Sequence, residues 1–123
     1  MEDYIATLFA GIIALLFLAL GAPLAMNKVR PNTVYGYRVS RYVFEDEDLW
    51  YKINGRGGRH MVTAGIVFVI YAGFSAFFIG NEGAQVVLNL ALLALVVIFL
   101  AYELTWSVRL ARRTAREKVL IED

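Results

Sequence analysis

The sequence contains no cysteine, which excludes disulfide bonds, thiolate metal sites and nucleophilic thiols. It contains a single histidine, His60, and no metal-binding partner lies near it in the sequence. We find no Ser/His/Asp set, no paired acidic residues at membrane depth and no redox group. These absences argue against an enzyme and predict neither a cofactor nor a metal site.

Asp, Glu, Lys and Arg are also missing from three long runs, Tyr4–Asn27, Met61–Asn81 and Gly83–Tyr102. At a rise of about 1.5 Å per residue, some twenty helical residues cross the roughly 30 Å hydrocarbon core of a bilayer. We therefore expect an all-α integral membrane protein, a single domain with spans at about 4–24, 61–79 and 84–104. The acidic start Met1-Glu2-Asp3 is opposite to the positive n-region of a signal peptide, so we expect the first run to be a retained span.

The basic residues are confined to two segments, an insert at 28–60 and a C-terminal tail that we expect to form a basic helix at 105–119. The charged side chains of the N-terminus and of the link at Gly80–Gly83 are all acidic. Because basic residues mark the cytoplasmic side, the sequence predicts an N-out, C-in multi-pass protein of the plasma membrane. The twelve basic residues are Lys28, Arg30, Arg38, Arg41, Lys52, Arg56 and Arg59 in the insert, and Arg109, Arg112, Arg113, Arg116 and Lys118 in the tail.

The insert is predicted to have two parts. Pro31–Val39 should be extended or turn-like, since Pro31 fixes φ and Gly36 permits a sharp bend. Glu45–Asn54 should form a short amphipathic helix that Gly55 ends, with four acidic residues at the positive end of its dipole. Its apolar stripe, Leu49, Trp50 and Ile53, would then lie in the membrane interface.

The insert carries an ordered set of residues. Asn32, Tyr35, Gly36, Tyr37 and Arg38 form one element, and Trp50 and Asn54 form a second. This order, over about Gly21–Gly73, resembles the SdpI family, whose membrane domain carries Asn-x-x-Tyr-Gly-(Tyr/Phe)-Arg and then Trp-x-x-x-Asn between two spans.

The resemblance implies a three-span binding module. Founding members of the family protect a producing cell from its own secreted toxin and hold a transcriptional repressor at the membrane. They also carry additional N-terminal membrane segments, which this sequence lacks. The implied partners are a toxin peptide and a cytoplasmic regulator protein.

Several insert residues have chemistry suited to binding. Arg38 can stack on aromatic rings or fork onto a carboxylate or phosphate, and Arg56 and Arg59 could contact anionic lipid headgroups. Glu103 should pair with one of these arginines and so tie the insert to the third span. The alternative is that the cluster only folds the insert against the bundle. The candidate ligand- or partner-binding residues are Asn32, Tyr35, Gly36, Tyr37, Arg38, Trp50, Asn54, Arg56, Arg59 and Glu103.

Other features have two interpretations each. The glycine-rich segment Asn54–His60 is either a weak anionic-lipid contact or a flexible hinge. Small residues at Gly65, Ala72, Gly73, Ala76 and Gly80 favour packing inside the bundle, with a homodimer seam as the alternative. The tail is expected to contact anionic lipid or a protein, and no feature predicts nucleic-acid binding.

The spans contain a few polar residues. Gln85 and Asn89 should hydrogen-bond across helices. A rival function, a small transporter or channel subunit, would use Asn89, Ser75 and Tyr71 to line a path between protomers. A structural membrane assembly factor is a further alternative.

Overall fold

In this computed structural model, which describes residues 2–32, 35–38, 43 and 45–122 (for 118–122 the backbone alone), the chain forms three long helices. They are α1 (Ile5–Ala25), α3 (Glu47–Ala76) and α4 (Glu82–Glu122), and no strand occurs within the described ranges. Each helix is long and apolar enough to cross a membrane. The predicted all-α architecture with three spans is confirmed.

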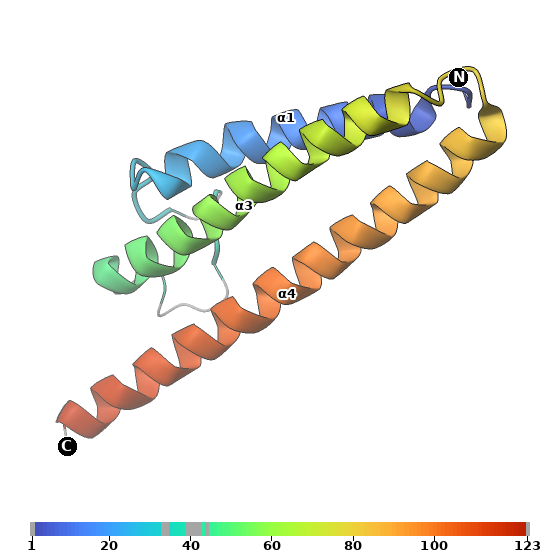
Figure 1. Cartoon of the computed structure of the whole chain (residues 1–123). Coiled ribbons are helices and arrows are strands. Elements are labelled where there is room, and N and C mark those ends of the chain that lie inside the picture. The colour runs from blue at the N-terminus through green and yellow to red at the C-terminus, as the bar shows by residue number, and fades with distance from the viewer. Residues whose placement is uncertain (1, 33–34, 39–42, 44, 123) are drawn as a thin grey trace.

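The helices are arranged as a close pair and a third, obliquely placed helix. α1 and α3 lie side by side, and α4 turns back after α3 and diverges from the pair along its length (Figure 1). Gly80, with φ of +92°, makes the turn between α3 and α4, and its N–H donates to the carbonyl of Asp3. The insert and the basic tail therefore share one end of the molecule, opposite the acidic end, as the charge pattern predicts. The N-out, C-in orientation remains a prediction.

Small residues allow α1 and α3 to approach closely. Gly58 faces the main chain of Gly21 and Leu24, where an added Cβ would come within 2.7 Å of backbone atoms. Gly65 faces the Leu18 side chain, whose Cγ would lie 2.8 Å from an added Cβ. Gly73, in contrast, has nothing within 4 Å of its Cβ position. These contacts lie inside the bundle, and a homodimer stays a prediction.

At the acidic end, a buried glutamine joins all three helices. Gln85 Oε1 accepts from the backbone N–H groups of Ala6 (2.9 Å) and Thr7 (3.2 Å), while its Nε2 donates to the carbonyl of Ser75 (2.8 Å). The first turn of α1 has no side-chain cap of its own, so a residue of α4 satisfies these amides. The predicted cross-helix role of Gln85 is confirmed. Asn89 differs, because its Oδ1 is buried with no hydrogen-bond partner among the described residues.

The insert helix and the second span are one helix, so the prediction that Gly55 ends a short helix is wrong. Asp46 caps α3 by accepting from the N–H of Leu49 (3.2 Å), and the helix then continues for 30 residues. At about 1.5 Å per residue this length is roughly 45 Å, longer than the hydrocarbon core. Segment 54–60 is therefore helical and is not a flexible hinge. Glycines persist in it because neighbouring groups fill the space that side chains would need.

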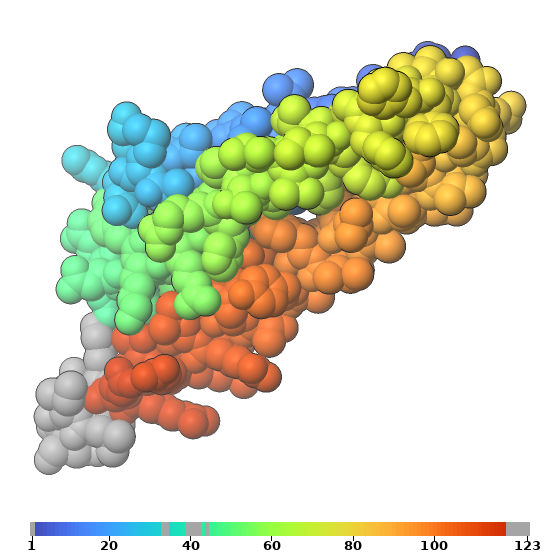
Figure 2. Space-filling model, in the orientation of Figure 1, coloured from blue at the N-terminus to red at the C-terminus, as the bar shows by residue number. Residues whose placement is uncertain are grey.

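The apolar stripe of the insert is buried in protein. Leu49, Trp50 and Ile53 pack in one cluster with Trp106 and Ala111 of α4, and Trp50 and Ile53 have no exposed surface. The prediction of an interfacial stripe is therefore wrong, because α4 continues past its apolar run and covers this face. In the space-filling view, α4 lies against the first turns of α3 at this end (Figure 2).

Candidate functional site

The two elements of the insert motif come together on the first turns of α3. Asn54 Oδ1 accepts from the backbone N–H of Tyr37, and Asn54 Nδ2 donates to the carbonyls of Trp50 (3.0 Å) and Tyr37 (3.3 Å). Gly36 has a φ of +117° and lies against Asn54 and the Trp50 ring, which leaves no room for a side chain. The amide of Asn54 thus fixes the bend that positions Tyr37.

Further contacts hold the insert to α1. Asn32 Oδ1 accepts from the N–H of Tyr35 (2.6 Å), and the Tyr35 hydroxyl donates to the carbonyl of Leu20 in α1. Trp50 Nε1 donates to the carbonyl of Val29 (2.8 Å). The predicted turn is present at the described positions 35–36, while Thr33, Val34 and Val39 lie outside the described residues.

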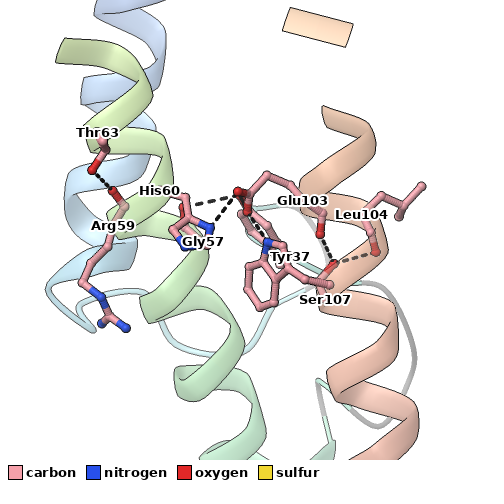
Figure 3. Close-up of polar contacts among 9 residues, drawn as sticks. Tyr37, Gly57, Arg59, His60, Thr63, Glu103, Leu104 and Ser107 are labelled. Carbon is pink, nitrogen blue, oxygen red and sulfur yellow. Dashed lines mark hydrogen bonds and ion pairs between the residues drawn. The ribbon is translucent and has the colours of Figure 1, made fainter. Parts of the chain in front are cut away.

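Tyr37 reaches a buried carboxylate on α4. Glu103 is 4% exposed, and its Oε2 accepts from the Tyr37 hydroxyl (2.9 Å) and from Trp106 Nε1 (2.7 Å). His60 Nδ1 lies 2.7 Å from Oε1 of the same carboxylate (Figure 3). We call Tyr37, His60, Glu103 and Trp106 the Glu103 cluster. It joins the insert, α3 and α4 through one side chain.

The Glu103 cluster alters the acid–base behaviour of Tyr37. Burial and, second, the nearby Glu103 carboxylate raise the pKa of the Tyr37 phenol well above its ordinary value. The phenol stays protonated and donates to Glu103 over the whole physiological range. Gly57 lies directly beneath the Tyr37 ring, where a Cβ would come within 2.7 Å of three ring carbons.

The arginines are placed differently from the prediction. The described side-chain partners of Glu103 are Tyr37, His60 and Trp106, not an arginine. Arg56 instead stacks on the Trp106 ring, with 4.6 Å from its Cζ to the ring centroid. Arg59 points away from Glu103 (Figure 3) and lies beside Gly55. Arg38 has an exposed side chain that makes contacts of its own. The predicted tie between insert and third span exists, but Tyr37 makes it.

Two members of the Glu103 cluster were not among the predicted site residues. They are His60, noted above only as the single histidine with no metal-binding partner near it in the sequence, and Trp106. Besides their contacts with Glu103, the rings of His60 and Trp106 pack on each other edge to face, with their centroids 5.4 Å apart. Their positions at the same membrane side, one at the end of each of two predicted spans, are the sequence signal that could have paired them.

The buried carboxylate of Glu103, held by three side-chain partners, has a defined geometry. Among the described residues, no cluster of three or more His, Cys, Asp or Glu side chains could hold a metal ion. Of the acidic run Glu45–Asp48, Asp46 is the N-cap of α3, and Glu47 and Asp48 lie in its first turn.

Polar groups of the spans are largely engaged within the chain. The Ser75 hydroxyl is 2.8 Å from the Thr7 hydroxyl and 2.8 Å from the carbonyl of Ala72. The Tyr71 hydroxyl donates to the carbonyl of Leu88. Of the three residues suggested for a transport path, Asn89 alone has a buried polar atom without a described partner.

Comparison with known proteins bears on this arrangement. A family model described as the SdpI/YfhL protein family matches residues 28–103, a range that begins with the insert and ends at Glu103. Neither the curated proteins nor the solved structures contain a match to the chain. The matched range covers more than half of the sequence and includes the whole of α3 and the part of α4 up to Glu103. The chain is therefore a multi-pass membrane protein that belongs to the SdpI/YfhL family.

Proposed function

We propose that this protein is a binding protein of the plasma membrane that confers immunity to, or senses, a toxin peptide. The insert recognises the peptide or a similar amphipathic ligand at the membrane surface. The same insert then signals to a cytoplasmic regulator protein by holding or releasing it. The family supplies the class of function, and the geometry of the insert supplies the residues.

One observation carries this proposal, namely the link from the insert to α4 through Tyr37 and Glu103. The hydroxyl–carboxylate contact of 2.9 Å connects positions 66 residues apart in the sequence. A ligand that moves the insert must therefore change the contacts of α4, or break this bond. A module that served only to fold the loop would not need a buried carboxylate, which is costly to place at the membrane boundary.

Survival of toxin-treated cells tests the proposal. The chain is expressed in bacteria that are killed by the secreted toxin peptide of an SdpI-family producer, and the lethal dose is measured. We expect the parent chain to raise that dose. Tyr37→Phe and Glu103→Gln should each remove about tenfold or more of the protection, because a hydrogen bond to a charged group contributes about 1.5–3 kcal/mol.

Matched controls separate recognition from folding. Tyr102→Phe and Glu117→Gln make the same chemical changes at exposed positions of α4 and should leave protection intact. All variants are compared at equal amounts in the membrane fraction. Absence of protection by the parent chain would refute the immunity function. Equal protection by the parent, Tyr37→Phe and Glu103→Gln would show that the insert is not the active element.

A small transporter or channel subunit is the second candidate, and Asn89 is the observation that favours it. Its buried, unpartnered Oδ1 could accept a hydrogen bond from a solute at membrane depth. Flux of small solutes through proteoliposomes tests this candidate. A binding protein should give no flux above that of empty vesicles, whereas a transporter should give flux that Asn89→Leu abolishes.

A further inference from the structure

A groove beside the Glu103 cluster is surrounded by three arginines. It has a volume of about 360 Å³, and Arg56 of α3 faces Arg109 and Arg113 of α4 across it. Its remaining wall is formed by Tyr102, Thr105, Trp106 and Leu110. Ligand pockets in proteins begin at about 300 Å³, so the groove has room for a phosphate ester with a small headgroup.

The charge of this groove is uniformly positive. None of its lining residues is acidic. The Glu103 carboxylate, which is bonded to Trp106 of the groove wall, also accepts from Tyr37. Glu117 pairs with Arg113 at 3.2 Å, on an exposed part of the helix, which leaves Arg56 and Arg109 as the main positive charges. An anion is therefore the chemical class that this groove favours.

Arg56 is pre-organised for such an anion. Its Cζ lies over the Trp106 ring, 4.6 Å from the ring centroid, which holds the guanidinium at the wall of the groove. The N–H donors of a guanidinium form a planar fork that matches two phosphate oxygens. The Thr105 hydroxyl on the same wall donates to the carbonyl of Ala101 (2.7 Å), so the arginines are the donors that face the groove.

The position of the groove selects a lipid as the source of the phosphate. The uncharged run Gly83–Tyr102 would cover about 30 Å as a helix, which places Thr105–Arg109 at the headgroup layer. On the membrane side of the groove, Tyr102 and Leu104 are 56% and 59% exposed, as expected of residues that contact acyl chains. We propose that Arg56 and Arg109 bind the phosphate of one anionic phospholipid on the leaflet that carries the insert. This site is separate from toxin recognition and does not depend on it.

Native mass spectrometry of the full chain released from detergent micelles tests the proposal. The probes are phosphatidylglycerol and phosphatidylcholine of the same acyl composition. We expect one phosphatidylglycerol to be retained in preference to phosphatidylcholine. Arg56→Gln and Arg109→Gln should each lower its retention by about tenfold, the effect of losing one charge-assisted contact.

Arg59→Gln is the matched control, because it removes the same charge from the same helix on the side away from the groove. Its retention should equal that of the parent. Equal losses in all three variants would mean that general surface charge attracts the lipid, and would overturn the site. Equal retention of the two lipids would also overturn it.

A further arm separates lipid from soluble phosphate. Millimolar inorganic phosphate should not displace the bound phosphatidylglycerol, and complete displacement would refute a lipid site. Arg56→Lys keeps the positive charge but lacks the planar guanidinium. Its retention of phosphatidylglycerol should therefore lie between that of the parent and that of Arg56→Gln. Retention at the level of the parent would show that the stacked guanidinium is not part of a site.

Discussion

At the scale of single residues, the carboxylate of Glu103 shows how the chain satisfies a polar group beside lipid. Burying a charge is costly unless hydrogen bonds replace those to water. Tyr37 and Trp106 donate to one oxygen, and His60 approaches the other at 2.7 Å. The cluster is polar at its centre and aromatic at its rim, where the Tyr37 and Trp106 rings lie 5.9 Å apart.

The raised pKa of Tyr37 gives a prediction about alkaline titration. The fold stabilises the neutral phenol, so this contribution is complete below the ordinary tyrosine value of about 10 and is lost as pH rises above it. In the folded protein, the absorbance of ionised tyrosine at alkaline pH should be the same for the parent and Tyr37→Phe up to about pH 11. In denaturant, the parent should show one more titrating phenol. A lower signal for folded Tyr37→Phe would mean that Tyr37 is open to water.

Substitution by leucine should affect the stability of the bundle differently at two amide side chains of α4, Gln85 and Asn89. Gln85→Leu leaves the amides of Ala6 and Thr7 without their acceptor and should destabilise the bundle by about 1–3 kcal/mol. Asn89→Leu removes an oxygen that has no described partner and should be neutral or stabilising. The measurement is unfolding in mixed micelles with increasing dodecyl sulfate, followed by circular dichroism. Equal destabilisation by both would contradict this assignment.

At the scale of the elements, α3 depends on glycine for its contacts. Gly57 accommodates the Tyr37 ring and Gly58 accommodates the backbone of α1. Glycine weakens a helix by roughly 1 kcal/mol relative to alanine. Here that cost is offset by close helix–helix contact, which is the main source of packing energy in a membrane.

A pair of glycine substitutions tests this role. Gly58→Ala would put a methyl group against main-chain atoms of α1, which cannot move aside, and should destabilise the bundle by about 1–3 kcal/mol. Gly73→Ala has nothing within 4 Å and should leave stability unchanged or raise it slightly. The same micelle unfolding assay measures both. A Gly58→Ala variant as stable as Gly73→Ala would show that α1 and α3 are not in close contact.

The sequence predicted the elements better than it predicted the site. Long uncharged runs locate helices because lipid forces backbone groups to bond within a segment, so α1, α3 and α4 follow from composition. The glycines of α3 misled the prediction of a helix end at Gly55. The groups that leave no room for a side chain, such as the Tyr37 ring and the main chain of Gly21, lie elsewhere in the sequence. Likewise His60 and Glu103 are 43 residues apart, and nothing local identifies them as partners.

At the scale of the whole molecule, polar contacts concentrate at the two ends. Gln85 joins the helices at the acidic end, and the Glu103 cluster joins them at the basic end. Between these ends the contact is mainly apolar, through residues such as Phe68 and Leu92, with a hydrogen bond from the Tyr71 hydroxyl to the carbonyl of Leu88. This distribution suits a protein whose middle lies in hydrocarbon and whose ends lie at two water interfaces.

The absence of cysteine makes orientation directly measurable. Single replacements Asn81→Cys, in the turn between α3 and α4, and Lys52→Cys, on the exposed face of the insert, give each molecule one reactive thiol. In intact cells, a membrane-impermeant maleimide should label Asn81→Cys and should reach Lys52→Cys only after permeabilisation. The positive-inside pattern is the reason for this expectation. The reverse labelling pattern would contradict the N-out, C-in orientation.

The unbroken course of α3 has a mechanical consequence. The helix runs for about 45 Å without a break, so its two ends tilt together. A partner that pushes on the exposed Lys52 side of its first turns therefore displaces Ser75 and its neighbours at the far end of the helix. The insert end and the turn end of the bundle are thus coupled through a single helix.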